Sequence, residues 1–361
     1  MPTIARLPLE DYVTAIFTAV GCEPAEASAI GRRLVSANLA GHDSHGVVRV
    51  ADYVQRLKAG KIRANGHVTV ITDTGVFAIL DGASGFGQVI GAEAMALGMS
   101  KAGHAGVALI ALRRTHHLGR IGDWAEECAN EGFASIHLVN AVDFGAVVAP
   151  FNGRDRRVST NPFCCGMPGP HGRHLILDFA TSRIAEGKVI VARNKGMEVP
   201  EGCIIDAEGR PTRDPHALHP DGALLPFGEH KGGGLSFFCE ILAGALSGGG
   251  CQYDGRPDTG QIHNNMLSII IDPRHVGGAS LVMGEVERYV AWMKSSRPLA
   301  QDGEVLVPGE PERRTREIRT RDGIPLDEET WRQLRNTAQH AGLPDILSDD
   351  LVAAVGMDRA P

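Results

Sequence analysis

The sequence predicts a mixed α/β protein in which helices from both chain ends surround a central segment that contains a β-sheet. Three observations support this prediction: apolar residues recur with helical spacing near the N-terminus, short apolar strands alternate with helices in the middle, and charged helical segments return near the C-terminus. We therefore expect a discontinuous helical domain, residues 1–66 and 285–361, and an α/β domain, residues 67–284.

The spacing of the apolar residues predicts the first helical part. Tyr12, Ile16 and Val20 recur every four residues, and strand-forming runs are absent from residue 9 to about residue 60. After it, alternating strands and helices indicate layers of sheet and helix. The predicted strands are VTVIT, VFAILDG, VALIALRR, FASIHLVN, HLILDFA and MLSIIIDP. The predicted helices are 92–102, 124–130, 183–195 and 235–246, and the Gly- and Pro-rich stretch 196–226 predicts surface turns.

The C-terminal part predicts a helix over VERYVAWMKSS, a loop over VLVPGEPE and a second helix over LDEETWRQLRNTAQHAG, with Asp327 as its N-cap. Since both chain ends are helical, we expect them to pack together as one domain. The sequence shows neither an internal repeat nor a low-complexity tract.

Composition excludes several functional classes for this chain of 361 residues. A net charge of -7 without a basic run argues against nucleic-acid binding. The N-terminus lacks the pattern of a signal peptide, and the most apolar segment, Leu235 to Leu246, is too short to span a membrane. Seven irregularly spaced cysteines indicate reduced thiols, so we expect a cytoplasmic protein that contacts neither nucleic acid nor membrane.

A glycine-rich turn, Gly85-Phe86-Gly87 followed by Gly91, superficially matches a dinucleotide-binding motif. The third glycine comes one residue too late, and the next strand ends in Arg113-Arg114 without an acidic residue to hold a ribose. We therefore favour a turn at which a helix packs closely on a strand over a Rossmann site.

The first candidate for chemistry is the stretch from Gly41 to Tyr53. If a helix begins near Ser44, then His45, Arg49 and Tyr53 lie on one face. The imidazole could exchange the hydroxyl proton of a 2-hydroxy acid, and the guanidinium could bind its carboxylate through two hydrogen bonds. Ser44 could cap the helix or fix the imidazole tautomer. The alternative is a capping serine, a solvated arginine and a half-buried tyrosine.

The second candidate, Arg114 to Arg120, lies where a strand ends and a helix begins, a common ligand position in α/β proteins. The adjacent His116 and His117 are poorly placed to chelate one metal ion, so we expect a single imidazole with a polar role and no metal site. A metal-dependent hydrolase or lyase that uses His45 with these two histidines is the alternative. The third candidate is the segment around Lys231, which could bind an anion or form a flexible loop with an exposed lysine.

Eight segments resemble, in this order, the malate/L-lactate dehydrogenase family of NAD(P)-dependent oxidoreductases. They are GHDSHGVVRVADYV, THHLGRIGDWAE, STNPFCCGMP, LILDFATSRIAEGKV, PEGCIIDAEGRPTRDP, FGEHKGGGL, VLVPGEPERRTRE and GIPLDEETW, and they span nearly the whole chain. The resemblance implies a fold unrelated to the Rossmann type, with a helical portion from both chain ends and an α/β portion that binds the cofactor. It also implies a homodimer with its active site in the cleft between the portions.

The resemblance also implies roles for individual residues. The catalytic candidates are His45 as proton donor or acceptor, Ser44 as its partner, and His117, which matches a His-aromatic-Gly motif in which Leu118 replaces the aromatic residue. The candidate substrate contacts are Arg49, Tyr53 and Thr160. The candidate cofactor contacts are His117, Leu118, Gly119, Arg120, Asn140, Asp178, Phe179, Ala180, Lys231, Pro308, Gly309, Glu310 and Arg313.

The expected reaction is hydride transfer between NAD(P) and C2 of a 2-hydroxy or 2-oxo acid, with NAD favoured, NADP as the alternative, and no metal. Some imine-reducing relatives carry an aspartate at a position that Lys188 occupies here. This difference disfavours the reduction of a cyclic imine carboxylate, which stays the main alternative substrate class.

Overall fold

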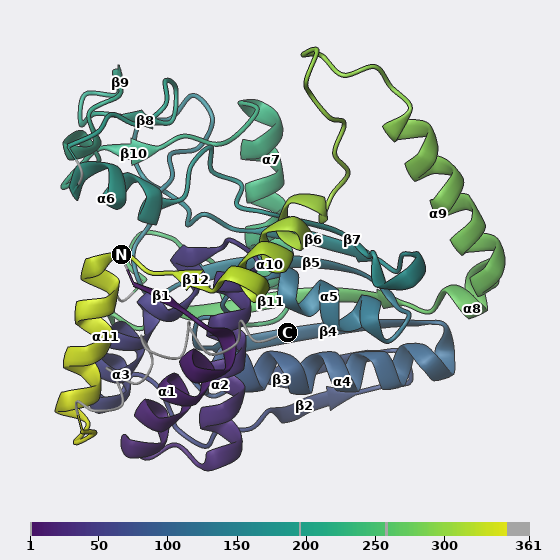
Figure 1. Ribbon diagram of the computed structural model, residues 1–361, viewed down its shortest axis with the longest axis horizontal. Helices are drawn as coiled ribbons and strands as arrows, with labels where there is room; N and C mark the ends of the chain where they lie inside the picture. The colour runs from purple at the N-terminus through teal and green to yellow at the C-terminus, as the bar shows by residue number, and fades with distance from the viewer. Residues whose placement is uncertain (1, 195, 257–258, 345–361) are drawn as a thin grey trace.

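The computed structural model describes residues 2–194, 196–256 and 259–344 (Figure 1). Its helices are α1 (Arg6–Ala19), α2 (Pro24–Leu39), α3 (Val50–Lys58), α4 (Gly87–Ala105), α5 (Gly122–Asn130), α6 (Glu186–Asn194), α7 (His230–Cys239), α8 (Pro273–Val276), α9 (Ala279–Lys294), α10 (Glu310–Asp322) and α11 (Glu328–His340). Its strands are β1 (Thr3–Ile4), β2 (Thr69–Asp73), β3 (Phe77–Asp81), β4 (Val107–Thr115), β5 (Ala134–Val142), β6 (Phe163–Met167), β7 (Leu175–Phe179), β8 (Ile204–Ile205), β9 (Pro211–Thr212), β10 (Ala223–Leu224), β11 (His263–Ile271) and β12 (Ile324–Pro325).

A seven-stranded sheet in the order β2-β3-β4-β11-β5-β6-β7 forms the centre of the molecule. Strands β3 and β4 pair in parallel, and each of the other neighbouring pairs in this sheet is antiparallel. Two smaller sheets, β10-β8-β9 and β1-β12, lie outside it. This architecture confirms the predicted mixed α/β class.

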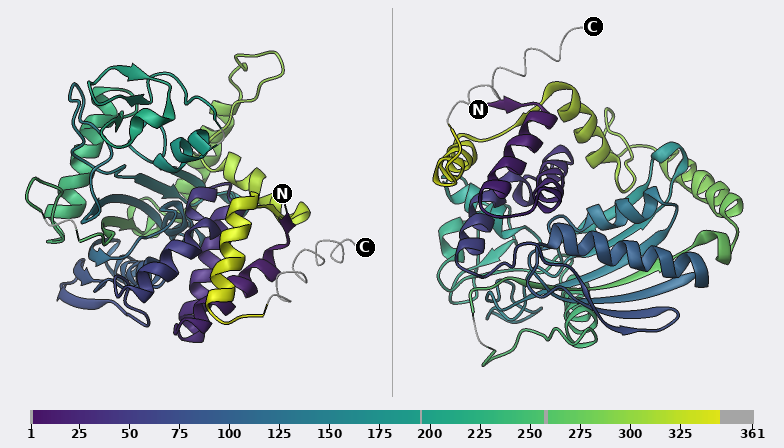
Figure 2. Two further views of the ribbon diagram at one scale, coloured as in Figure 1. Left: turned by 90° about the vertical axis from the view of Figure 1, so that its left-hand side faces the viewer. Right: turned by 90° about the horizontal axis from the view of Figure 1, so that it is seen from below.

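Helices cover both faces of the large sheet. Val139 of β5 belongs to the core shared with α4 and α5, whereas the next side chain, Asn140, bonds to Glu240. Because successive side chains of a strand point to opposite faces, Glu240 and its π-helical turn (Glu240–Ala245) lie across the sheet from α4 and α5. The views in Figure 2 show α4 lying along one face of the sheet.

The N-terminal helices and the C-terminal helix α11 share one hydrophobic core. Leu9, Phe17 and Tyr53 pack in the same cluster as Ile324 and Leu334. Figure 1 shows α11 beside α1 and α3, although they are far apart in the sequence. The predicted cap of α11 is confirmed, since the side chain of Asp327 accepts a hydrogen bond from the backbone nitrogen of Thr330 at 2.8 Å.

The helix α9 stands apart from this core. It projects at one side of the molecule in Figure 1 and buries none of its side chains. Leu281, Tyr289 and Trp292 are exposed along it. Within the part of the chain that the structure describes, no helix is both long and apolar enough to cross a membrane.

The condition of one continuous helix from Ser44 onward is not met. Two short 3₁₀ helices, Asp43–His45 and Val47–Arg49, precede α3. Gly46 separates them and adopts an extended conformation, with φ -90° and ψ -149°. A Cβ atom at Gly46 would come within 2.1 Å of the Oδ1 atom of Asn38, so the close contact between these residues fixes the break.

Three further elements differ from the prediction. The strand β6 lay outside the predicted strands, and α7 begins at His230, so Lys231 lies in its first turn rather than in a preceding loop. The predicted loop over VLVPGEPE gives way to α10 at Glu310. Acidic residues in the first turn of α10, basic residues in its last turn and a proline near its start all favour this helix.

The glycines of the turn after β3 and of the first turns of α4 allow close packing of that helix. A Cβ atom at Gly87 would lie 2.3 Å from the carbonyl oxygen of His117, and one at Gly91 would lie 2.4 Å from the indole ring of Trp124. Both glycines therefore allow α4 to approach the segment after β4 closely.

Candidate active site

The loop that carries His45 is fixed by buried polar contacts. The Oδ1 atom of Asn38 accepts a hydrogen bond from the backbone nitrogen of Val47 at 2.8 Å, and its Nδ2 atom donates to Asp43 at 2.7 Å. Asp43 also forms a salt bridge of 2.6 Å with Arg319 of α10. The C-terminal part of the chain thus holds the loop in place.

The backbone and side chain of Ser44 bring His45 and Arg49 together. The Ser44 hydroxyl lies 3.0 Å from Nδ1 of His45, and the Ser44 carbonyl accepts a hydrogen bond of 2.7 Å from Nε of Arg49. The two terminal nitrogens of Arg49 bond to no other residue that the structure describes. The imidazole ring of His45 stacks on that of His117, with ring centroids 5.5 Å apart.

His117 is oriented by Tyr53 and Gln88. The Tyr53 hydroxyl lies 2.6 Å from Nδ1 of His117 and accepts a hydrogen bond of 3.3 Å from the Gln88 side-chain amide. Because the amide supplies one proton to the phenol oxygen, the phenol proton is free to point at Nδ1. This arrangement leaves the hydrogen of a neutral His117 on Nε2, as a donor.

Burial and positive charge keep these imidazoles neutral. Burial, with a smaller contribution from the Arg49 charge, lowers the pKa of His45 to about 3. Burial likewise lowers the pKa of His117 well below its ordinary value. Burial raises the pKa of Tyr53 to about 12, so its hydroxyl stays protonated.

His116 packs against Tyr53 but makes no hydrogen bond within this group. It is 1% exposed, its ring meets that of Tyr53 edge-on, and neither of its ring nitrogens has a hydrogen-bond partner among the described residues. Burial lowers its pKa to about 3. Across the described residues, no group of three or more His, Cys, Asp or Glu side chains is arranged to hold a metal ion.

Arg120 lies at the centre of a buried acidic cluster. Its Nη1 atom donates to Asp123 at 3.0 Å and to Glu126 at 2.9 Å, and Asp178 lies 4.0 Å from its Nε atom. Asp178 also accepts a hydrogen bond of 2.7 Å from the backbone nitrogen of Gly122, at the start of α5. Burial raises the pKa of Asp178, and the charge of Arg120 opposes this shift.

Two nitrogens of Arg120 remain available at this position. The side chain is 1% exposed, yet neither Nε nor Nη2 makes a hydrogen bond to any described residue. Buried donors without partners are costly, so a bound polar group would satisfy them.

A pocket of about 520 Å³ adjoins the Arg120 cluster. Gly309 belongs to its wall, and a Cβ atom there would lie 3.0 Å from the carbonyl oxygen of His174. The Nη1 atom of Arg313 donates to that same carbonyl at 3.2 Å. The lining residues are Arg33, Ser36, Asp123, Glu126, Glu127, Asn130, Gly172, His174, Ile176, Gly309, Arg313 and Arg316.

Asn140 lies in a separate polar network. Its Nδ2 atom donates to Glu240 at 2.9 Å and to the Gly250 carbonyl at 3.1 Å, while its Oδ1 atom accepts from Asn265 at 2.9 Å. The side chain is fully buried, so both ends of its amide are already bonded within the protein.

The other candidate cofactor residues differ in exposure and in whether their side chains already have partners within the protein. The Glu310 carboxylate binds Lys294 at 2.6 Å. Pro308 and Lys231 are exposed. The half-buried Phe179 ring packs edge-on against Phe227, with centroids 5.1 Å apart.

The remaining candidates contribute backbone geometry. The backbone nitrogen of Leu118 donates to Asn264 at 2.9 Å, and Gly119 adopts a φ of +74° that favours glycine. The Thr160 carbonyl accepts a hydrogen bond of 2.8 Å from the Thr181 hydroxyl. Ala180 lies half-buried in the turn after β7.

Asp123, Glu126 and Gln88 lie outside the predicted site residues. Asp123 and Glu126 follow Arg120 by three and six residues at the start of α5, so their spacing could have indicated a cluster around that cation. Gln88 has no comparable signal, because its contact with Tyr53 joins two separate elements.

Comparison with known proteins identifies the family. Residues 4–335 match the family model for malate/L-lactate dehydrogenase. Hydroxycarboxylate dehydrogenase B of Escherichia coli K12 is 45% identical over 93% of this chain and 94% of that protein. The chain belongs to the malate/L-lactate dehydrogenase family. Its members are oxidoreductases, which implies a nicotinamide cofactor.

Further relatives show the breadth of this family. An L-lactate dehydrogenase of Cupriavidus necator is 37% identical over 86% of this chain and 89% of that protein. A solved structure from Escherichia coli, provisionally described as a malate/lactate dehydrogenase, matches all of both chains with a TM-score of 0.92 and 42% identity. Other family members are named malate dehydrogenase, L-sulfolactate dehydrogenase and Delta(1)-pyrroline-2-carboxylate/Delta(1)-piperideine-2-carboxylate reductase.

Proposed function

We propose that this family member transfers a hydride between a nicotinamide dinucleotide and C2 of a 2-hydroxy or 2-oxo acid. The observation that carries this proposal is the position of Ser44, which contacts both the imidazole of His45 and the guanidinium of Arg49. A proton-transfer group and a carboxylate-binding group thereby lie side by side, as a 2-hydroxy acid requires.

Arg49 binds the substrate carboxylate in this proposal. Its Nε atom is bonded to Ser44, so the guanidinium is oriented while its two terminal nitrogens stay available for a paired interaction with the carboxylate. The negative charge of that carboxylate would offset the positive charge that helps to lower the pKa of His45. Substrate binding would therefore make protonation of His45 easier.

His45 exchanges the proton on the C2 oxygen. Its neutral form accepts that proton during oxidation, and its protonated form returns it during reduction. The Ser44 hydroxyl holds Nδ1, which leaves Nε2 for the substrate. His117, held by Tyr53, offers its Nε2 hydrogen to a substrate oxygen, and Thr160 is a further candidate contact.

The residues around Arg120 fit a dinucleotide. Its unpartnered buried nitrogens call for a polar ligand, and the adjoining pocket of about 520 Å³ extends to Gly309 and Arg313. We propose that Arg120, Asp178, Phe179 and Lys231 hold the cofactor. Further contacts would come from Leu118, Gly119, Ala180, Pro308, Gly309, Glu310 and Arg313, whereas the predicted contact of Asn140 is disfavoured because both ends of its amide are bonded within the protein. When bound, the nicotinamide would supply or accept the hydride at C4.

The charges around the pocket favour NAD over NADP. Arg33 pairs with Glu127, and Arg316 pairs with Glu126 at 3.1 Å. Two of the three lining arginines are therefore neutralised, which leaves Arg313 as the cation to meet a 2′-phosphate. NADP remains the alternative cofactor.

Three further properties belong to the proposal. The sheet, with one parallel strand pair, and the core shared by both chain ends support a non-Rossmann fold with domains 1–66 plus 285–361 and 67–284. The exposed apolar side chains of α9 support a homodimer. All seven cysteines are free thiols, which supports a cytoplasmic location.

The test is a substrate panel followed at 340 nm. Pyruvate, oxaloacetate, 2-oxoglutarate and phenylpyruvate are each combined with NADH and with NADPH. Oxidation of NADH by at least one 2-oxo acid, lost in His45→Ala, would support the proposal. Activity with pyrroline- or piperideine-carboxylate alone would assign the imine reductase function that a named relative carries. Inactivity towards the whole panel would contradict both functions.

A further inference from the structure

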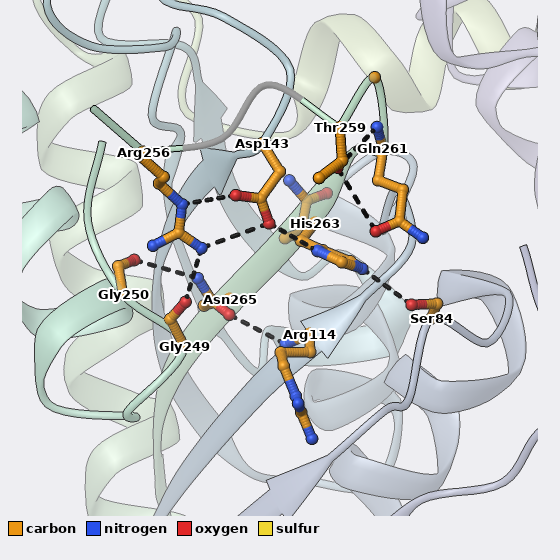
Figure 3. Close-up of polar contacts among 12 residues, drawn as sticks. Ser84, Arg114, Asp143, Gly249, Gly250, Arg256, Thr259, Gln261, His263 and Asn265 are labelled. Carbon is orange, nitrogen blue, oxygen red and sulfur yellow. Dashed lines mark hydrogen bonds and ion pairs between the residues drawn. The ribbon is translucent and has the colours of Figure 1, made fainter. Parts of the chain in front are cut away.

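A second group of residues, which includes neither Ser44 nor His45, has the connectivity of a nucleophilic triad. Figure 3 shows Arg256, Asp143, His263 and Ser84 in one line of polar contacts. The Ser84 hydroxyl lies 2.8 Å from Nε2 of His263, and Nδ1 of the same ring lies 2.8 Å from Oδ2 of Asp143. The serine and the carboxylate thus meet opposite nitrogens of one imidazole, as in serine hydrolases.

The fold brings these three residues together from distant parts of the sequence. His263 is the first residue of β11, opposite Val142, the last residue of β5. Asp143 directly follows Val142, so the register between β5 and β11 places Asp143 beside His263. Ser84 comes from the turn between β3 and α4.

The turn at Ser84 has an unusual backbone. Ala83 and Ser84 have φ values of 45° and 60°, a region that residues other than glycine rarely adopt. A serine in a strained turn between a strand and a helix is also the setting of the nucleophile elbow in α/β hydrolases. The half-buried Ser84 retains access to solvent.

Asp143 is held in the charged form that a triad needs. Arg256 binds it with its Nε atom at 2.5 Å and with its Nη2 atom at 3.3 Å. Although burial raises the pKa of Asp143, the hydrogen bonds from Arg256 and His263 bring it below the ordinary value. The ionised carboxylate places a proton on Nδ1 of His263 and leaves Nε2 as an acceptor for the Ser84 hydroxyl.

We propose that Ser84, His263 and Asp143 form a second reactive centre, in which Ser84 is acylated by small activated esters or thioesters. The Ser84 Oγ atom attacks the acyl carbonyl carbon while Nε2 of His263 takes its proton. The bond to the leaving alcohol or thiol then breaks, and His263 returns the proton to that group. Water releases the acyl group as a carboxylic acid by the same sequence.

The local backbone predicts slow ester turnover at Ser84. The backbone nitrogen of Gly85, the residue after the nucleophile, already donates to the Gly82 carbonyl at 2.8 Å. In α/β hydrolases the equivalent group stabilises the oxyanion. Because acylation and release both pass through an oxyanion, we expect both steps to be slow, with acylation outpacing release only for activated acyl groups whose leaving group departs readily.

The experiment measures covalent labelling of the full-length protein. A fluorophosphonate probe, which loses fluoride when the serine oxygen bonds to phosphorus, is followed by peptide mass spectrometry. Labelling should fall on Ser84 and vanish in Ser84→Ala. In Asp143→Asn, which retains the shape of the side chain, labelling should slow by about 100-fold or more. Ser100→Ala, at an exposed serine of α4, is the matched control and should label like the wild type.

A burst with p-nitrophenyl acetate is the second readout. One equivalent of nitrophenol per chain is expected, followed by slow turnover. His45→Ala should keep the burst, and Ser84→Ala should keep dehydrogenase activity, so this proposal and the dehydrogenase proposal fail independently. Absence of Ser84 labelling in the wild type, or equal labelling rates in folded Asp143→Asn, would overturn the triad.

Discussion

The hydroxyl of Tyr53 lies 2.6 Å from Nδ1 of His117 and thereby joins α3 to the segment that follows β4. Tyr53 is fully buried, and its only route to a hydrogen-bond acceptor among the described residues is this imidazole. The same hydroxyl accepts from Gln88, so its proton is directed towards His117. The helical part of the molecule therefore determines which nitrogen of His117 carries a hydrogen.

Tyr53→Phe tests this orientation. Loss of the phenol leaves Nδ1 of His117 without its partner, so both tautomers of the imidazole become accessible. We expect kcat with the best 2-oxo acid to fall by about 10- to 100-fold, and the free energy of unfolding to fall by about 1–3 kcal/mol. Steady-state kinetics and urea denaturation measure the two effects. Unchanged kcat would show that the tautomer of His117 does not matter.

Replacement of His45 tests the proposed proton transfer. His45→Gln should lower kcat by about 100- to 10,000-fold because no group remains to exchange the C2 oxygen proton. NADH binding, measured by fluorescence titration, should remain within about threefold of the wild type, since proton transfer is not part of it. His104→Gln, at an exposed histidine of α4, is the control and should retain full activity. Comparable loss in both variants would refute the assignment.

Arg49→Lys tests the carboxylate contact. Lysine retains the charge but cannot form the paired hydrogen bonds of a guanidinium, and it loses the contact between Nε and the Ser44 carbonyl. We expect KM for the 2-oxo acid to rise by about 10- to 100-fold, with a smaller change in kcat. An unaltered KM in steady-state assays would place the carboxylate elsewhere.

The low pKa of His45 predicts an unusual pH profile for oxidation. Its imidazole is neutral well below pH 6.5, because burial and Arg49 bring its pKa to about 3. The value of kcat/KM for hydroxy acid oxidation should therefore stay level as the pH is lowered from 7.5 to about 5. A decline with an apparent pKa near 6.5 in initial-rate measurements would mean that the free enzyme protonates His45 like an exposed histidine.

The buried His137 is expected to contribute to the loss of folding stability at low pH. It is fully buried between the hydroxyls of Ser135 and Ser268, and burial lowers its pKa from 6.5 to about 3. Between these values the unfolded chain binds a proton that the folded chain does not, so stability falls as the pH is lowered through this window. Between pH 7 and pH 5, the free energy of unfolding of His137→Gln should fall by roughly 2 kcal/mol less than that of the wild type. An unchanged loss in urea titrations at both pH values would contradict this.

Regular elements could be predicted from the sequence because their patterns are local. The strands at 107–115 and 134–142 are apolar runs, and the cap at Asp327 is read from the residues beside it. The loop with His45 could not be predicted in the same way. Its two short 3₁₀ helices depend on Asn38, which lies on another helix and contacts Gly46 and Val47.

The candidate site likewise contains both contacts between sequence neighbours and contacts between distant residues. Ser44, His45 and Arg49 are close in sequence and also meet in space, whereas the contact of Tyr53 with His117 spans 64 residues. Spacing along one chain segment cannot report such a contact. The contacts among Ser84, His263 and Asp143 could not be predicted for the same reason, since these residues come from a turn and from the ends of two strands.

Gly87, the first residue of α4, lets the His117 carbonyl approach closely because it has no side chain. Any attempt to redesign substrate range by directed evolution would therefore do well to leave this position unmutated. Variation can be concentrated on the exposed loops, while a methyl group at Gly87 would displace the His117 backbone and with it the position of the imidazole.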